Sequence, residues 1–278
     1  VAEYEGIKTG FSSLGAIGKS AEEVAREACR DFFDYHRSRG AVDPHLADQL
    51  IPYIALAKGM RVSLRVTVTG RNAADLPALF ELCEREGVQR ICVYHLAYAG
   101  RGARLQAFDL QHADRRAAVE GVFRRTIESH ASGRGLEVLT VDNHADGPFL
   151  ALWSREHAPQ RTGDIERLLR RNGGNSAGKG IGCIDNTGNV HPDQFWWSQT
   201  LGNVRERPFS EIWVDPSIEL LRRLRDRKFL LPERCRGCRW LDMCNGNLRV
   251  RAETATGDTW GFDPACYLTD AEIDGVQA

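Results

Sequence analysis

The residues best suited to chemistry are four cysteines near the end of this 278-residue sequence. Cys235 and Cys238 form a C-x-x-C pair, Cys244 follows after five more residues, and Cys266 comes from farther along the chain. A C-x-x-C turn directs two thiolates at one centre, and four thiolates suit either a tetrahedral Zn²⁺ ion or a [4Fe–4S] cluster. The spacing therefore predicts a metal centre held by Cys235, Cys238, Cys244 and Cys266.

The pattern favours a cluster over zinc and leaves disulfides as a third alternative. Structural zinc sites usually have two C-x-x-C pairs, and this sequence has one. A three-cysteine loop with a distant fourth ligand is more typical of a cubane, in which each thiolate binds a different iron. Disulfides are less expected, because the sequence shows no export signal. The other cysteines lie in helix- or strand-like patterns, where we expect buried, inert thiols; they are Cys29, Cys83, Cys92 and Cys183.

The composition excludes several classes of protein. The chain is 42% hydrophobic and 27% charged, which is ordinary for a globular protein. Its net charge of −1 gives no reason to expect nucleic-acid binding, and no apolar stretch is long enough to span a membrane. Arginine far outnumbers lysine, which would suit a polyanionic ligand or simply reflect the base composition of the gene. The arginines between residues 222 and 227 alternate with leucines, which is typical of the solvated face of a helix.

Two glycine-rich segments resemble phosphate-binding loops without completing the motif. Residues 173–180 end in Gly180 where the motif needs a hydroxyl, and residues 13–20 begin with Ser13 where it needs glycine. We expect turns at both places.

The elements that must position these residues follow an α/β pattern in the N-terminal half. Period-two or β-branched runs predict strands, and amphipathic tracts between them predict helices. Such alternation predicts a parallel sheet with helical crossovers. The expected strands are 7–12, 61–69, 88–95 and 136–141, and the expected helices begin near residue 21 and cover 44–58, 75–87 and 112–131.

The C-terminal half has a different organisation. Residues 147–171 read as helical, and residues 180–185 and 188–193 read as a hairpin. Short helices are expected at 209–213 and 217–227. Beyond Pro232 the sequence predicts mostly loop, which would need a metal or another cross-link for stability.

Sequence motifs around the cysteines carry a resemblance to a known family. GNVHPD at 188–193, LGNVRERPF at 201–209 and RCRGCRWLDMCNGN at 234–247 resemble the SPASM or twitch domain of radical SAM enzymes. HLAYAGRG at 95–102 and Gly173-Gly174-Asn175 are similar to the NirJ-like group of heme d1 biosynthesis. The resemblance implies a partial radical SAM (β/α) barrel at 1–145, a helical linker at 146–174, and a small α+β SPASM/twitch-type iron–sulfur domain at 175–278.

Two departures from the family pattern qualify the resemblance. Asp193 and Leu248 stand where full SPASM domains carry cysteines, which implies a single auxiliary [4Fe–4S] cluster on the four cysteines above. The C-x-x-x-C-x-x-C motif of the S-adenosylmethionine-cleaving cluster is absent. We therefore expect an N-terminally truncated fragment that is inactive alone, with S-adenosylmethionine and a second [4Fe–4S] cluster bound by the intact protein.

The resemblance also implies site residues. Arg65 is the candidate partner for the carboxylate of S-adenosylmethionine, although an ion pair with a neighbouring helix is an alternative. Ser12 or Ser13 could contact the same ligand. A tetrapyrrole site could be lined by hairpin residues, which a simple hairpin core would explain almost as well; these are His191, Asp193, Trp196 and Trp197.

The implied function of the intact protein is that of a cytoplasmic radical SAM enzyme, with the catalytic residues left unassigned. It would act on propionate side chains of didecarboxysiroheme, and an electron donor would serve its cluster. One alternative is the sister enzyme of alternative heme synthesis, which decarboxylates acetate groups of an iron tetrapyrrole. Another is a non-catalytic, zinc-stabilised structural or binding module. The sequence does not indicate an oligomeric state.

Overall fold

The computed structural model describes residues 2–4, 7–9, 19–38 and 62–274. The chain forms two compact units, residues 1–62 and 63–278. In the first, β1 (Ala2–Tyr4) pairs antiparallel with β2 (Ile7–Thr9), and α1 covers Ala21–Ser38. The strand predicted at 7–12 is thus confirmed for Ile7–Thr9, but it belongs to an antiparallel hairpin and not to a parallel sheet. The helix predicted at 44–58 lies outside the described residues.

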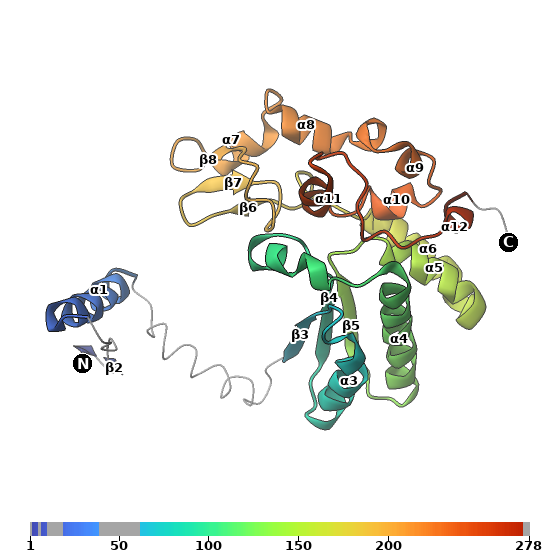
Figure 1. The fold of residues 1–278 in the computed structure, drawn as a ribbon, viewed down its shortest axis with the longest axis horizontal. Coiled ribbons are helices and arrows are strands. Elements are labelled where there is room, and N and C mark those ends of the chain that lie inside the picture. The colour runs from blue at the N-terminus through green and yellow to red at the C-terminus, as the bar shows by residue number, and fades with distance from the viewer. Residues whose placement is uncertain (1, 5–6, 10–18, 39–61, 275–278) are drawn as a thin grey trace. The chain divides into compact units, whose positions relative to one another are not determined.

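The second unit contains the predicted parallel sheet. Its order is β3 (Ser63–Thr67), β4 (Arg90–Tyr94) and β5 (Glu137–Val141), joined by helical crossovers (Figure 1). The crossovers are η1 (Ala73–Asp75) with α3 (Leu76–Arg85), and η2 (Gly100–Phe108) with α4 (His112–Ala131). The three strands form an open sheet among the described residues, not a closed barrel.

The two faces of this sheet differ. Ile91 and Val93 of β4 are buried against Phe80 of α3 and Val122 of α4, because their side chains share one face of the pleat. The opposite face carries the in-register row Arg65, Cys92 and Leu139. Arg65 and Leu139 are exposed there. This is the face that would point inward if further strands closed a barrel.

The helices α5 (Asp146–His157) and α6 (Pro159–Asn172) confirm the helical segment predicted at 147–171. Pro159 occupies the first turn of α6, and Gly173 ends it in the left-handed conformation. Phe149 and Trp153 of α5 pack with Phe123 of α4 and with Trp240 from the C-terminal segment. One apolar core therefore joins the sheet region (residues 63–141) to the cysteine region (residues 232–274).

The C-terminal part begins with the predicted hairpin and ends in short helices. β6 (Cys183–Ile184), β7 (Asn189–His191) and β8 (Gly202–Asn203) form an antiparallel sheet, followed by α7 (Phe209–Val214) and α8 (Glu219–Arg225). The prediction of mostly loop beyond Pro232 is right only in part, because four helices of at most eight residues lie there among the loops. Such helices are too short to show a helical period in the sequence. They are α9 (Glu233–Arg236), α10 (Leu241–Cys244), α11 (Arg249–Thr256) and α12 (Asp270–Asp274), preceded by η3 (Lys228–Leu230).

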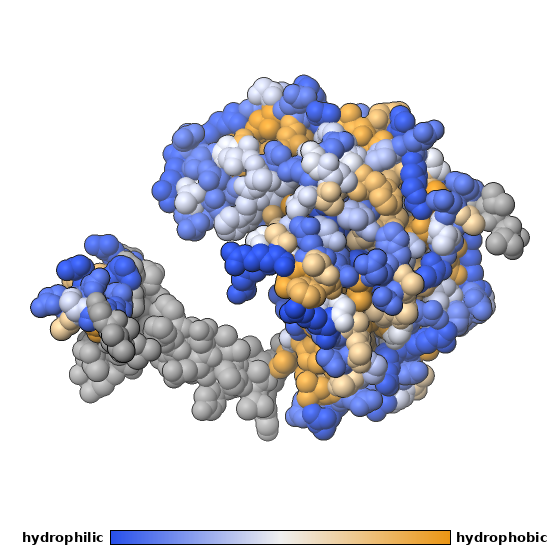
Figure 2. Space-filling model, in the orientation of Figure 1, coloured by the Kyte–Doolittle hydropathy of each residue, from blue (hydrophilic) through white to orange (hydrophobic). Residues whose placement is uncertain are grey.

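Hydrophilic and hydrophobic residues are interspersed on the face of the molecule in Figure 2. In the described part of the chain, none of the helices is both long and apolar enough to cross a membrane.

Candidate iron–sulfur site

The structure brings the four C-terminal cysteines to one place. Cys235 lies in α9, Cys238 in the turn that follows, Cys244 at the end of α10, and Cys266 between α11 and α12. All four are free thiols. Burial raises the pKa of each, and the neighbouring thiols Cys266, Cys235 and Cys238 raise that of Cys244 further. Four thiols are therefore close enough to influence one another's ionisation.

Hydrogen bonds shape the C-x-x-C turn. The Cys235 N–H donates to the carbonyl of Pro232 at 2.9 Å, and the Cys238 N–H donates to the carbonyl of Cys235 at 3.2 Å. The backbone N–H of Trp240 donates to Cys238 Sγ at 3.4 Å. Such N–H donors stabilise a thiolate.

The Gly-Gly-Asn segment holds Cys244 through direct backbone contact. A Cβ on Gly174 would lie 2.4 Å from the carbonyl carbon and oxygen of Cys244, so no other residue fits. The Asn175 N–H donates to the Cys244 carbonyl at 3.1 Å, and the Asn245 side chain donates to the Asn175 carbonyl at 2.6 Å. This motif therefore acts as a structural support for the cysteine loop.

The residues after Cys244 tie the cysteine region to the end of β5. Asn245, Gly246 and Asn247 all have positive φ, a conformation that Asn and Gly tolerate best. Asn247 Oδ1 accepts a hydrogen bond from the His144 N–H at 2.7 Å, and Asn247 Nδ2 donates to Asn143 Oδ1 at 2.7 Å.

A wholly buried arginine lies beside the thiols. Arg249 Nη1 donates to the carbonyls of Thr259 and Gly261, while its Nε has no partner among the described residues. The thiols of Cys235 and Cys244 are close enough to affect its charge. A buried guanidinium with a free N–H suits an anionic centre held by thiolates.

Within residues 62–274 and the shorter described segments, no three His, Cys, Asp or Glu side chains converge tightly enough to hold one metal ion. Four thiols are the ligand types of either a [4Fe–4S] cluster or tetrahedral zinc, and the choice of a cluster stays a prediction from the spacing of the cysteines.

A second buried arginine connects this region to the sheet. Arg251 forms a two-pronged ion pair with Asp263 at 2.8 and 2.9 Å. Its Nη1 also donates to the carbonyls of Leu96 and Asp142, which follow β4 and β5. Sequence reasoning missed Arg249 and Arg251, because a segment expected to be loop gives no sign of buried charge.

Arg227 corrects the prediction of a solvated arginine face at the end of the 222–227 run. It is 1% exposed and donates to Asn175 Oδ1 at 2.6 Å and to the Ala177 carbonyl at 2.8 Å.

The cysteines outside the C-terminal set differ in exposure. Cys29 is exposed and not buried, which corrects the prediction, whereas Cys83 and Cys92 are buried as expected. Cys183 is intermediate.

The motif at 95–102 contributes a buried polar network. His95 Nε2 lies 2.9 Å from Asp146 Oδ2, and the Tyr267 hydroxyl donates to Asp146 Oδ1 at 2.7 Å. The Arg115 guanidinium pairs with Asp109 at 2.9 Å and lies beside His95. Because these side chains pair with one another across elements, the network is suited to joining β4, α5 and the cysteine region.

Arg65 lies on the exposed face of β3. Its guanidinium donates to the Tyr94 hydroxyl on the neighbouring strand and stacks over that ring at 4.8 Å. Among the described residues its partner is therefore a tyrosine and not a helix carboxylate. Its role toward S-adenosylmethionine stays a prediction, and Ser12 and Ser13 lie outside the described residues.

The four hairpin residues occupy different environments. His191 and Trp196 are buried, and His191 Nδ1 donates to the Gln199 carbonyl at 2.8 Å, as a hairpin core would require. Trp197 is 57% exposed, with its ring parallel to that of His191 at 5.8 Å. Asp193 is buried and accepts the N–H groups of Phe195 and Trp196. Their role in binding a tetrapyrrole stays a prediction.

A polar cavity of about 280 Å³ lies at the carboxyl end of β5, beside Asp193. It is lined by residues that follow β5, residues that follow α6, and the segment after the hairpin; these include Asp142, His144, Asn175, Ser176, Asp193 and Phe195.

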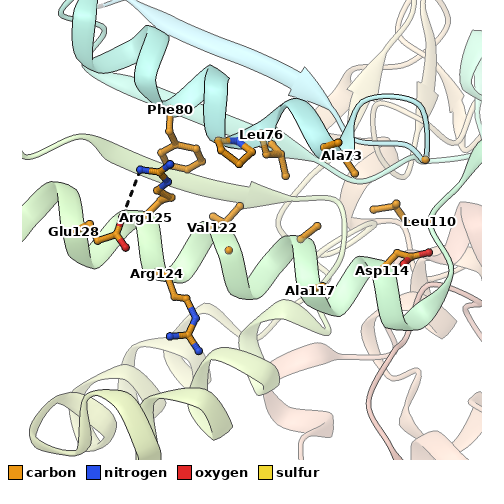
Figure 3. Close-up of a pocket in the computed structure, with 15 residues that line it drawn as sticks. Ala73, Leu76, Phe80, Leu110, Asp114, Ala117, Val122, Arg124, Arg125 and Glu128 are labelled. Atoms are coloured by element: carbon orange, nitrogen blue, oxygen red, sulfur yellow. Dashed lines mark ion pairs between the residues drawn. The ribbon is translucent and has the colours of Figure 1, made fainter.

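A larger groove of about 860 Å³ runs between α3 and α4 (Figure 3). Ala73, Leu76, Phe80 and Val122 line it, with the Arg125–Glu128 ion pair at one end. It lies on the helical side of the sheet, and none of the four C-terminal cysteines lines it.

Comparisons with known proteins agree with this geometry. The model of the SPASM family, an iron–sulfur cluster-binding domain, matches residues 176–239. Fe-coproporphyrin III synthase of Methanosarcina barkeri is 46% identical over 269 residues, which cover 95% of this chain and 67% of the relative. Pre-heme d1 synthase of Dinoroseobacter shibae is 42% identical over 277 residues, covering 94% and 67%. The chain thus spans about two thirds of both relatives.

Solved structures support the predicted fold class. Native anSMEcpe with bound AdoMet has a TM-score of 0.54 at 13% identity, covering 83% of this chain and 60% of that chain. SuiB of Streptococcus suis bound to S-adenosylmethionine has a TM-score of 0.51 at 17% identity, covering 76% and 46%. At these identities the likeness shows the fold alone. The predicted iron–sulfur cofactor is supported by the SPASM match, and S-adenosylmethionine is bound in the two solved neighbours. With relatives at 46% and 42% identity along nearly its whole length, this chain belongs to the radical SAM enzymes that carry a SPASM domain.

Proposed function

We propose that the intact protein is a radical SAM enzyme of heme d1 formation that acts on the propionate side chains of didecarboxysiroheme. The convergence of four free thiols beside the buried Arg249 carries the proposal, because it provides the ligand set for one auxiliary [4Fe–4S] cluster. The 42% identity to pre-heme d1 synthase supports the substrate class.

Each candidate residue has a distinct role in this proposal. Cys235, Cys238, Cys244 and Cys266 would hold the auxiliary cluster, which would supply one-electron chemistry when bound. Arg249 offsets the negative charge of the thiolates. Arg65 binds the carboxylate of S-adenosylmethionine, and Ser12 and Ser13 stay sequence-based candidates for the same ligand.

A second candidate function is favoured by the higher identity, 46%, to Fe-coproporphyrin III synthase. In this alternative the substrate is again an iron tetrapyrrole, but the reaction removes acetate carboxyls as CO₂. Both candidates use the same cluster and differ in which arm of the tetrapyrrole is attacked.

The experiment begins with anaerobic reconstitution of the intact protein. About four irons bound by the residues of this chain, lost in Cys235→Ala and retained in Cys29→Ala, would support the cluster. Cys29 is an exposed thiol, so its variant controls for loss of any cysteine. One tightly bound zinc without iron uptake would contradict the cluster and favour a structural module.

Turnover then separates the two substrates. The reconstituted protein, S-adenosylmethionine and a reductant are incubated with each tetrapyrrole, and products are analysed by mass spectrometry. Loss of propionate arms from didecarboxysiroheme supports the first candidate, and loss of CO₂ from acetate arms supports the second. Absence of 5′-deoxyadenosine with both tetrapyrroles would overturn the proposed substrate class.

A further inference from the structure

The polar cavity of about 280 Å³ lies where parallel α/β folds bind their ligands. Its lining includes Asp142, Asn143 and His144, which directly follow β5. Ligands of such folds bind outside the carboxyl ends of the strands, because the loops there converge around an open space. The segment that follows the hairpin closes the cavity from the other side with Asp193, Gln194 and Phe195. The cavity is therefore formed jointly by the end of the sheet and by the segment that follows the hairpin.

Asp142 is held in place by its backbone while its carboxyl is left without a hydrogen bond. Its φ is +67°, and its carbonyl accepts the hydrogen bond from Arg251 at 2.8 Å. Within the described part of the chain, no donor contacts either of its carboxyl oxygens. A lining side chain with no internal partner is available to a ligand.

Asp193 faces the same cavity with half of its carboxylate engaged. The side chain is buried, at 4% exposure. Oδ1 accepts the N–H groups of Phe195 at 2.8 Å and Trp196 at 3.0 Å, whereas Oδ2 has no partner among the described residues. The two backbone donors fix the orientation of the carboxylate.

The surroundings of Asp142 favour the protonated form of its carboxyl group near neutral pH. Burial, aided by the charge of Asp193 and opposed by Arg251 and Arg65, raises the pKa of Asp142 to about 7. Burial also raises the pKa of Asp193 and lowers that of His144 to about 4, so the imidazole is neutral. Close carboxyl groups in a poorly solvated site cannot all ionise, and one of them retains a proton.

We propose that this cavity receives one carboxylate arm of the iron tetrapyrrole, and that Asp142 donates a hydrogen bond to the arm in its protonated form. Asp193 acts as a positioning residue that keeps the proton on Asp142. The inference rests on the proposed function, because it assumes a substrate with carboxylate arms. The volume is near the lower limit of small-molecule pockets, so it suits an arm and not the macrocycle.

The chemistry requires a protonated partner for the arm. A carboxylate that enters beside two ionised aspartates would be repelled, since charges in a poorly solvated site interact strongly. A neutral carboxyl donates a hydrogen bond to an ionised acceptor, which is among the stronger kinds of hydrogen bond. Binding of the carboxylate arm should therefore require that Asp142 carries one proton.

The test is equilibrium binding of didecarboxysiroheme to the intact protein, followed by the absorbance of the tetrapyrrole between about pH 6 and about pH 9. Above pH about 7 the affinity of the unmodified protein should fall about tenfold per pH unit, because one proton is required. In Asp142→Asn the affinity should be independent of pH, since an amide donates at every pH. Asn also tolerates the positive φ at this position, which keeps the variant folded.

Two further variants sharpen the result. In Asp193→Asn the pH at which affinity begins to fall should move downward, because a negative charge that favours the proton is removed. Asp164→Asn, on the exposed side of α6, should behave as the unmodified protein does. An affinity that falls identically with pH in Asp142→Asn, or that never falls in the unmodified protein, would overturn the inference while leaving the substrate class intact. No binding at any pH would overturn the proposed function as well.

Discussion

The sheet region, residues 63–141, and the cysteine region, residues 232–274, are held together by different forces. Between β4 and the helices the buried residues are apolar, such as Phe80, Ile91 and Val122. The cysteine region instead buries Arg249, Arg251 and Asp263 at 1% exposure or less, and depends on backbone contacts with Gly174. Apolar packing tolerates gradual change, whereas a buried charge or a backbone contact fails when one partner is lost.

The difference has a functional consequence. A small, loop-rich segment cannot bury enough apolar surface to fix four thiols. Its polar network does so by tying the cysteine loop to the ends of β4 and β5, through Arg251 and Asn247. The same bonds hold Asp142 and His144, which line the cavity, so the cysteine loop and the proposed arm site share structural supports.

The largest effect is expected from Arg251→Met. The change leaves Asp263 as an unpaired buried charge and removes the donor to Leu96 and Asp142, which should cost about 3–5 kcal/mol of unfolding free energy. The loss of unfolding free energy is measured by urea unfolding. A cost under about 1 kcal/mol would show that the cysteine region does not depend on this ion pair.

Neighbouring glycines offer a matched comparison of a close contact and an open position. Gly174→Ala places a Cβ against the Cys244 carbonyl and should cost about 2–4 kcal/mol, with iron content reduced after reconstitution. Gly173→Ala has a similar φ but its nearest contact is 4.0 Å away, so it should cost only about 1 kcal/mol and retain iron. Equal effects on iron would contradict the role assigned to the Gly174 contact.

Asp142, at the junction between the two regions, should make the free energy of unfolding depend on pH. Because the folded-state pKa of Asp142 is raised to about 7, the folded protein binds more protons than the unfolded chain between pH about 4 and about 7. The contribution of Asp142 to stability is therefore lost as pH rises through that window. Asp142→Asn should remove this loss and raise the free energy of unfolding at pH about 8, seen by urea unfolding at several pH values. An unchanged pH profile would show that Asp142 ionises normally.

Much of the sheet region was predictable because its signals are local. The β-branched run containing Val66 and Thr67 and the twenty-residue helix α4 show their periods within one element. The set of four cysteines that the structure brings together was equally visible from spacing. The buried state of Arg249 and the cavity beside Asp142 were not, because both depend on contacts between segments more than a hundred residues apart or on helices too short to show a period.

The smallest effect should come from a solvent-exposed ion pair inside the sheet region. Arg90 and Glu137 form a two-pronged pair across β4 and β5 at 2.8 and 3.1 Å, yet both side chains are more than a third exposed. Water screens such a pair, so Glu137→Gln should cost under about 1 kcal/mol, and less in high salt. Set beside Arg251→Met, the same kind of bond would then be nearly dispensable in one region and essential in the other. A cost at Glu137 comparable to that at Arg251 would mean that burial is not what distinguishes them.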